Sequence, residues 1–578
     1  MNAQEIIKNR FDSIECKCFT ESDVSTELCS IPDAERGSFE NTAEWLAFVL
    51  VERGNNEWGT YYGPRFKKTD NTYFPPREMI TDDIITYWEK RANDVVNPIL
   101  KARYSGLVCD FKRNCDGNIR AMHIQSIIDL IVGNYHKYPI IGVSQLQRAM
   151  QFAIQSKNAE TIEKVKSIIP DYETKVAKEY QAGIWGGIFL LMFNNINHFS
   201  NEEREGYVNR LEQRLNNLTS KNIDGKGDDR FDPFVIQDAV DLLASYYNKF
   251  GDRKNLKRVL DILYNSFEKA AIYFSAMQKQ MLWSKLYRVF NKYQFGDKAK
   301  EILDELQNSS RNILDEMSEI EVPFEIPQEK IEEFINEMTS GTKEEVFEKF
   351  VRNFIPNKDD LEKQLIDISK TAPLFALCPT QIYDYKGRPS SVIGDIESDL
   401  EGNLALHISK ALNFSTVFLH STITENINKK NFSKENIMLL LQECPLFEKD
   451  RLEIIGRGLD SYFNEDYLTM LHLLIPQIEN AVRNIVELSG HSSLKSQKNN
   501  NGFQLMAFED LLKDEAVLNF GEDFVYYLRI LFTNQKGWNL RNSICHGIIP
   551  LSFFNYMTAD RVFHSLICIG SIRFSEVH

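Results

Sequence analysis

Apolar residues recur at helical spacing through most of this chain, and this periodicity is the feature that most restricts its fold. From residue 81 onward, segments of helical length carry apolar side chains three and four positions apart, with short polar connections between them. The helical segments expected before residue 310 span 82–103, 119–134, 142–156, 159–168, 172–193, 201–215, 233–250, 255–274, 277–293 and 296–308. The pattern predicts an all-α protein in which antiparallel helix pairs stack into a helical-repeat-like array.

The same pattern predicts four parts along the chain. We expect residues 1–80 to form an irregular N-terminal segment, and residues 81–370 to form an all-helical array that serves as a sensing or scaffold region. Three prolines and a glycine interrupt the helical pattern at 372–389, which indicates a boundary. We therefore expect a linker with connecting helices at 371–450 and a separate C-terminal helical bundle at 451–578.

Composition restricts the partners and the compartment. The formal charge of −16 argues against a nucleic-acid coat protein, which needs a broad basic surface, but it permits a nuclease with a small basic cleft. The nine cysteines are odd in number and form no C-x2-C pair, so we expect a reduced, cytoplasmic protein without a bound metal or cofactor. The most apolar stretch, 182–193, is too short to cross a bilayer, so we expect no membrane partner.

One short segment has polar residues arranged for chemistry. Arg541, Asn542 and His546 lie between two strongly apolar helical patterns, 523–532 and 556–574. Residues four apart share a helix face, so Asn542 and His546 point the same way, whereas Arg541 lies roughly 140° around the axis from His546. Two copies of the segment that meet across a dyad can aim both groups at one atom. A permanent cation beside a titratable base suits cleavage of a phosphodiester by an adjacent hydroxyl without a metal.

The segment Leu540-Arg-Asn-Ser-Ile-Cys-His-Gly547 resembles the signature of the HEPN superfamily, in particular a bacterial branch with an R-N-x-x-x-H motif. Residues 473–483 resemble the long helix that precedes the motif in that branch, and 58–64 and 87–91 resemble the N-terminal parts of bacterial proteins that carry this domain. The resemblance implies a metal-independent RNA endonuclease that is active as a dimer and is used as a toxin or in defence against phage. Some members of the superfamily instead bind nucleotides or act as scaffolds.

The resemblance also suggests a role for each site residue. Arg541 stabilises the charged phosphorane, His546 serves as general acid or base, and Asn542 holds either a phosphate oxygen or the His546 ring. The products are a cyclic phosphate and a free 5′-hydroxyl. Glu479 and Arg483, four positions apart on the preceding helix, are the supporting residues, and Glu479 is expected to orient Arg541.

The expected partners are the RNA substrate, a second copy of the chain, and a regulatory protein or antitoxin. Two other functions remain open: a non-catalytic helical interaction protein whose HEPN-like domain binds a nucleotide or mediates dimerisation, and a toxin silenced by a neighbouring antitoxin. Cys545 is interpreted as a small packing residue. The polar stretch 489–502, with Lys495 and Lys498, is expected to be a mobile loop that gates RNA access if it lies near the motif.

Overall fold

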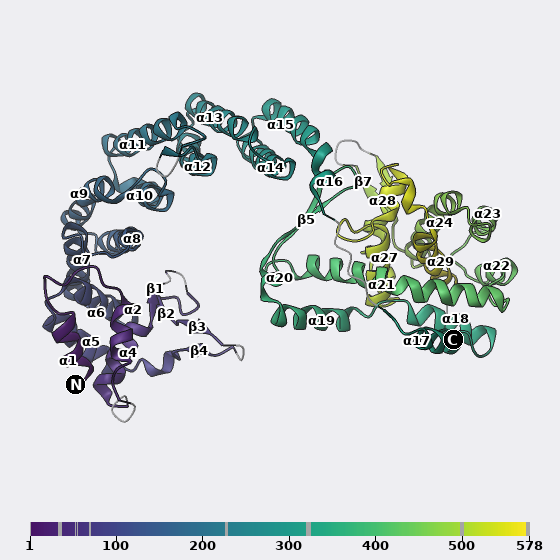
Figure 1. Cartoon of the computed structure of the whole chain (residues 1–578), viewed down its shortest axis with the longest axis horizontal. Helices are drawn as coiled ribbons and strands as arrows, with labels where there is room; N and C mark the ends of the chain where they lie inside the picture. The colour runs from purple at the N-terminus through teal and green to yellow at the C-terminus, as the bar shows by residue number, and fades with distance from the viewer. Residues whose placement is uncertain are drawn as a thin grey trace. The chain divides into compact units, whose positions relative to one another are not determined.

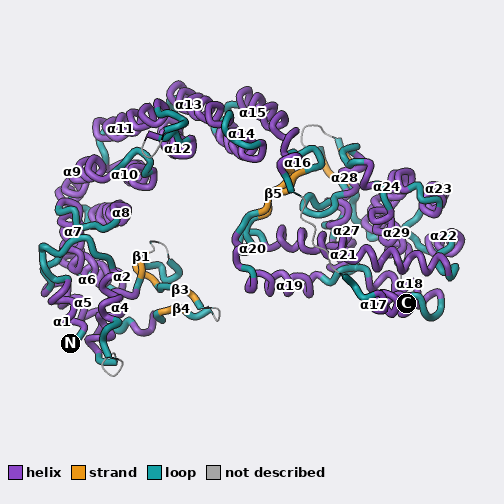
Figure 2. Tube along the Cα trace, in the orientation of Figure 1, coloured by secondary structure: helices purple, strands orange, loops and turns teal. Residues whose placement is uncertain are grey.

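Helices dominate the computed structural model of the chain, which describes residues 2–32, 37–52, 54, 56–68, 71–225, 229–318, 325–497 and 502–573. The structure is 68% helical, and the strands of the described residues form only short antiparallel pairs (Figure 2). The all-α expectation is therefore confirmed. The chain divides into two compact units, the first made of Met1–Phe274 and Arg288–Gly296 and the second of Ser275–Tyr287 and Asp297–His578.

The first 80 residues contain a packed core, which differs from the irregular segment expected there. Their elements are α1 (Ala3–Arg10), α2 (Glu21–Leu28), α4 (Phe39–Val49), β1 (Val51–Glu52), β2 (Tyr62–Gly63), β3 (Phe66–Lys67), β4 (Tyr73–Phe74) and η1 (Arg77–Met79). Strands β1 and β2 pair, as do β3 and β4. Asn2 and Thr20 form capping boxes at the starts of α1 and α2. These two helices have eight residues each. Such short segments contain too few apolar repeats for helical periodicity to be recognised in the sequence.

A series of longer helices completes the first unit (Figure 1). They are α5 (Asp82–Asp94), α6 (Pro98–Phe111), α7 (Gly117–Val132), α8 (Pro139–Gln155), α9 (Ala159–Val176), α10 (Ala182–Asn194), η2 (Ile196–His198), α11 (Asn201–Ser220), α12 (Pro233–Lys249) and α13 (Arg253–Ala271), while α14 (Ala276–Lys292) contributes residues to both units. Most of these helices pack against their neighbours in the sequence, as in stacked helix pairs. The pattern predicts a break at 169–171, but α9 runs through Pro170 and ends at Val176.

The second unit contains the remaining helices and two hairpins. Its elements are α15 (Gly296–Ser309), η4 (Ser310–Asn312), α16 (Ile313–Glu316), α17 (Gln328–Met338), α18 (Lys343–Asn353), α19 (Lys358–Thr371), α20 (Pro373–Leu377), β5 (Thr380–Tyr383), β6 (Pro389–Ile393), α21 (Leu400–Asn428), α22 (Lys434–Gln442), α23 (Arg451–Phe463), α24 (Tyr467–Leu488), β7 (Leu494–Ser496), β8 (Phe503–Leu505), α25 (Phe508–Leu511), α26 (Glu515–Leu518), α27 (Glu522–Phe532), α28 (Leu540–Cys545), η5 (Leu551–Phe553) and α29 (Tyr556–Gly570).

One hydrophobic core runs through the second unit, from Met338 on α17 to Ile569 on α29. The segment 371–450, expected to be a linker with connecting helices, belongs to this core, because buried side chains of α21 and α22 pack in the same cluster as those of α24 and α29. The break at 372–389 is α20 and the start of the β5–β6 hairpin inside this unit. Helical periodicity is the same in an array and in a bundle, so only the prolines and glycine indicated a boundary here. Because hairpins also contain proline and glycine, these residues do not distinguish a domain boundary from a hairpin within one domain.

Candidate functional site

The short helix α28 (Figure 1) carries the R-N-x-x-x-H motif as far as Cys545, and His546 is its C-cap. The helix is fixed by its buried face. Leu540, Ser543 and Ile544 are buried, and the helix packs against α24 and α27. These three positions share one side of a helix because they are three and four residues apart. The remaining side chains of the motif, Arg541 and His546 among them, are therefore directed away from the core.

A tight loop leads from α27 into α28. A side chain on Gly537 would come within 2.4 Å of the carbonyl oxygen of Ile530, so only glycine fits where the loop returns along α27. The backbone N–H of Trp538 donates to that same carbonyl at 2.8 Å. Asn539, the residue before the helix, has a φ of 51°, in the left-handed region that asparagine tolerates better than most residues. The loop thus determines where Arg541 emerges.

Glu479 on α24 joins two guanidinium groups. Arg541 Nε donates to Glu479 Oε2 at 2.8 Å, and Arg541 Nη2 donates to Oε1 at 3.4 Å. Arg483, one turn further along α24, donates through Nη2 to Glu479 Oε1 at 3.2 Å. The hydrogen bond to Glu479 raises the pKa of Arg541 above its ordinary value. The three side chains are 13–27% exposed and together carry one net positive charge, which is suited to an anion such as a phosphate.

The other two predicted residues have different environments. Asn542 Nδ2 donates to Asn539 Oδ1 at 2.8 Å, and Asn542 Oδ1 accepts from Arg541 Nη1 at 3.2 Å. His546 is exposed, its backbone N–H donates to Asn542 O at 3.0 Å, and its ring makes no hydrogen bond to a described residue. Asn542 therefore steadies the arginine rather than the His546 ring. Cys545 is exposed, which differs from the packing role expected for it, because the buried positions of α28 are 540, 543 and 544.

The described residues of the polar stretch 489–502 belong to a hairpin that adjoins these charges. Its described residues include β7, and β7 pairs with β8 to form a hairpin. Lys495 pairs with Asp510, whereas Lys498 lies outside the described residues. Arg483 Nη1 donates at 3.3 Å to the carbonyl oxygen of Met506, the residue after β8. The hairpin is thus linked through Arg483 to the Glu479–Arg541 pair.

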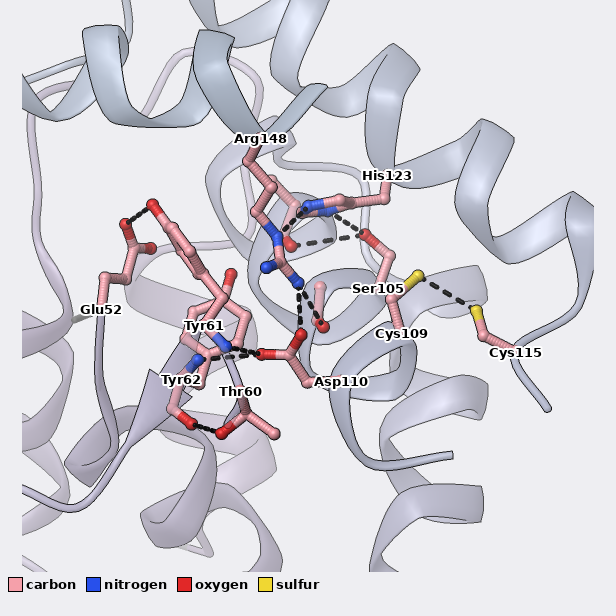
Figure 3. A network of polar contacts seen from close by, with 12 residues as sticks. Glu52, Thr60, Tyr61, Tyr62, Ser105, Cys109, Asp110, Cys115, His123 and Arg148 are labelled. Atoms are coloured by element: carbon pink, nitrogen blue, oxygen red, sulfur yellow. Dashed lines mark hydrogen bonds and ion pairs between the residues drawn. The ribbon is translucent and has the colours of Figure 1, made fainter. Parts of the chain in front are cut away.

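A second polar site, in the first unit, was missed by sequence reasoning. Arg148, Asp110, His123, Tyr61 and Glu52 form a network of hydrogen bonds and ring contacts beside a cavity (Figure 3). The five residues come from five separate segments of the chain and share no spacing, so no local motif marks them. Only the fold of α6, α7 and α8 around the β1–β2 pair brings them together.

The described ranges contain no group of three or more His, Cys, Asp or Glu side chains placed to hold a metal ion. Across the same ranges, no helix combines the length and the apolar character needed to cross a membrane.

Comparisons with known proteins found no match to this chain among protein-family models, curated proteins or solved structures. The HEPN resemblance therefore depends on the residues of the chain itself, chiefly 473–483 and 540–547.

Proposed function

We propose that the second unit is a metal-independent RNA endonuclease of HEPN type, which acts as a dimer and serves as a toxin or an effector of phage defence. One observation carries the proposal. On α28, Arg541 is held by Glu479 close to the surface, and the exposed ring of His546 lies at the end of the same short helix. This pairs a fixed cation with an accessible proton carrier on a rigid support.

In the proposed reaction, the 2′-hydroxyl of the RNA attacks the neighbouring phosphorus. A bond forms between the 2′-oxygen and phosphorus while the bond from phosphorus to the 5′-oxygen breaks. Arg541 stabilises the charge of the phosphorane, and His546 either removes the proton of the 2′-hydroxyl or protonates the leaving 5′-oxygen. The products are a 2′,3′-cyclic phosphate and a free 5′-hydroxyl. Glu479 acts as a positioning residue, because it fixes the guanidinium through Nε and Nη2.

A dimer is part of the proposal for two reasons. Arg541 and His546 diverge by roughly 140° on one helix, so a shared target atom needs one group from each copy. The segment after the motif exposes apolar side chains that soluble proteins commonly cover: Leu551 is 74% exposed, and Phe553 and Tyr556 are partly exposed. A second copy that covers this segment brings its own α28 to the same place.

Cleavage of a single-stranded RNA by the purified full chain, with EDTA present, tests the proposal. We expect His546→Ala to lower the cleavage rate by about 10²–10⁴-fold, the usual contribution of a general acid or base. His198→Ala, which removes an exposed histidine of the first unit, should leave the rate unchanged. Mass spectrometry should identify the cyclic phosphate. Cleavage that requires an added divalent metal, or that survives in His546→Ala, argues against this mechanism.

Two observations favour a second candidate, a non-catalytic interaction protein. Arg541 already has a carboxylate partner, and the formal charge of −16 disfavours RNA binding in general. In that case the Arg541/His546 pair binds a nucleotide or stabilises the dimer. A double variant, Arg541→Ala with His546→Ala, that folds, dimerises and keeps the full biological effect supports this candidate over the nuclease.

A further inference from the structure

A polar cavity of about 1010 Å³ lies within the first unit. Its walls are the first turns of α2, the end of α4 with strand β1, the segment before β2, the end of α6, and one face of α8. The α8 face carries the neutral amides of Gln147, Gln151 and Gln155, spaced four residues apart. A cavity of this size with a few converging polar groups is typical of a small-molecule site.

One end of the cavity is built on a closed ion pair (Figure 3). Arg148 Nη2 donates to Asp110 Oδ1 at 2.8 Å, and Asp110 Oδ2 accepts the backbone N–H groups of Tyr61 and Tyr62 at 3.0 and 2.8 Å. Arg148 Nε donates to His123 Nε2 at 3.1 Å. The charges of Arg148 and Asp110 therefore cancel, and their positions are fixed from several sides.

The Arg148 guanidinium still offers one donor. Its carbon lies 4.2 Å from the ring centre of Tyr61 and 4.8 Å from that of Phe152. The side chain is 7% exposed and lines the cavity, and its Nη1 makes no hydrogen bond to a described residue. A guanidinium nitrogen at a cavity wall with no partner among the described residues can donate a hydrogen bond to an acceptor oxygen of a ligand in the cavity.

The other end of the cavity has an excess of negative charge. Arg103 Nη1 is buried without a hydrogen-bond partner, and it lies 3.5 Å from Glu21 Oε1 and 3.8 Å from Glu52 Oε1. Both carboxylates line the cavity, and they share this single guanidinium. Burial and the nearby charge of Glu21 raise the pKa of Glu52 to about 7. Among the described residues, Arg103 is the one cation within ion-pair distance of these carboxylates, so one negative charge lacks such a partner when both are ionised.

Tyr61 connects the two ends. Its ring lies on the Arg148 guanidinium and its hydroxyl donates to Glu52 Oε2 at 2.9 Å, so one side chain bridges the Arg148 guanidinium and the Glu52 carboxylate (Figure 3). A ligand with an acceptor oxygen at one end and a cation at the other complements the Arg148 donor and the two carboxylates. A phosphate group does not, because Arg148 in the cavity wall is already paired with Asp110, and the two carboxylates at the other end repel an anion.

We propose that this cavity binds a small molecule whose protonated amine or guanidinium lies between Glu21 and Glu52 and whose acceptor oxygen receives a hydrogen bond from Arg148 Nη1, the chemistry of a basic amino acid. The inference concerns the first unit alone and does not depend on RNA cleavage in the second. It assigns a ligand-binding function to the region that the sequence pattern suggests is a sensing or scaffold array.

Isothermal titration calorimetry of the full chain tests this site with four probes: L-arginine, agmatine, L-citrulline and AMP. We expect L-arginine to bind with a stoichiometry of about one per chain. Agmatine lacks the carboxylate. L-citrulline lacks the side-chain cation and keeps only the α-ammonium beside its carboxylate, at the wrong end of the molecule for Glu21 and Glu52. Each should therefore bind about tenfold or more weakly, the usual effect of one charged hydrogen bond. Equal binding of L-citrulline and L-arginine, binding of AMP alone, or no saturable binding of any probe at millimolar concentration overturns the proposal.

A pair of charge-matched variants separates the site from a general effect of charge. Glu52→Gln should weaken the binding of L-arginine about tenfold or more, whereas Glu15→Gln, at an exposed position outside the cavity, should leave the affinity unchanged.

The groups that face Glu52 are Glu21, Arg103, Tyr61 and Arg148. Because cation binding ionises Glu52, titrations at pH 7 in buffers of different ionisation enthalpy should report release of about half a proton per ligand, lost in Glu52→Gln. Native affinity in Glu52→Gln with no proton release refutes the assignment.

Discussion

Among single residues, Glu479 joins the two arginines of the candidate nuclease site. It accepts hydrogen bonds from both Arg541 and Arg483, so one carboxylate balances half of the positive charge there. Without it, two guanidinium groups would repel each other, and Arg541 would lose the two bonds that direct it. The surplus charge that this arrangement leaves is small and local, which is compatible with the proposed phosphate-binding role in a chain of formal charge −16.

We expect Glu479→Gln to destabilise the second unit by about 1–2 kcal/mol and to lower RNA cleavage, because the neutral amide accepts fewer and weaker hydrogen bonds from the arginines. Urea unfolding followed by circular dichroism measures the first effect. Glu453→Gln is the matched control: Glu453 pairs with Arg457 four residues on, both are more than 70% exposed, and its loss should cost less than about 0.5 kcal/mol. Equal effects of the two changes would show that Glu479 has no special role.

Glu52 gives the first unit a pH dependence of defined sign. Its pKa is about 7 in the folded protein against an ordinary 4.5, so the folded state holds a proton that the unfolded chain has lost. Stability therefore falls as pH rises from about 4.5 through 7, and the loss persists above that range. Glu52→Gln removes this ionisation. We expect the free energy of unfolding of the variant to be about 1–3 kcal/mol higher than that of the native protein at pH 8, and equal to it near pH 4.5. Hydrogen exchange of α2, α4 and β1 measures the difference, and a difference independent of pH contradicts the assignment.

Among the helices, α28 shows how a few apolar residues position a site. It contains six residues, too few to be stable alone, and is held by the burial of Leu540 and Ile544 against α24 and α27. The positions of the site residues on α28 therefore depend on this packing.

Ile544→Ala should therefore reduce cleavage although it touches no proposed catalytic group. Ile544 is 4% exposed, and we expect the change to cost about 2–4 kcal/mol and to speed hydrogen exchange in α28. Ile368→Ala, at a position of α19 that is 39% exposed, removes the same atoms from the surface of this unit and should have little effect. Native exchange rates in α28 of the Ile544 variant would show that this packing does not hold the helix.

The long helices and the residues of the α28 motif could be identified from the sequence because a pattern of consecutive residues marks each of them. The segment expected at 233–250, for example, became α12 at Pro233–Lys249, with Asp232 as its cap. Short elements such as α1 contain too few apolar repeats to show helical periodicity. The prolines and glycine around the β5–β6 hairpin are also typical of a linker, so the hairpin was not predicted. The cavity lay beyond sequence reasoning, because Glu21, Arg103 and Arg148 become neighbours only when α2, α6 and α8 pack in one unit.

For the chain as a whole, two compact units carry two different kinds of chemistry. The first contains a polar cavity, and the second carries an arginine and a histidine at its surface. In the proposed nuclease the surface pair is incomplete in one chain, because the two groups diverge on α28. The central claim is therefore that each active site takes Arg541 from one copy and His546 from another.

Mixing two inactive variants tests this claim most directly. Arg541→Ala and His546→Ala proteins, each without cleavage activity alone, are combined in equal amounts, allowed to exchange subunits, and assayed on RNA with EDTA present. In a mixed dimer one site loses both groups and the other keeps both, so random exchange should restore about a quarter of the native activity. A mixture that stays inactive, although sedimentation or mass spectrometry shows mixed dimers, contradicts a site shared between two copies.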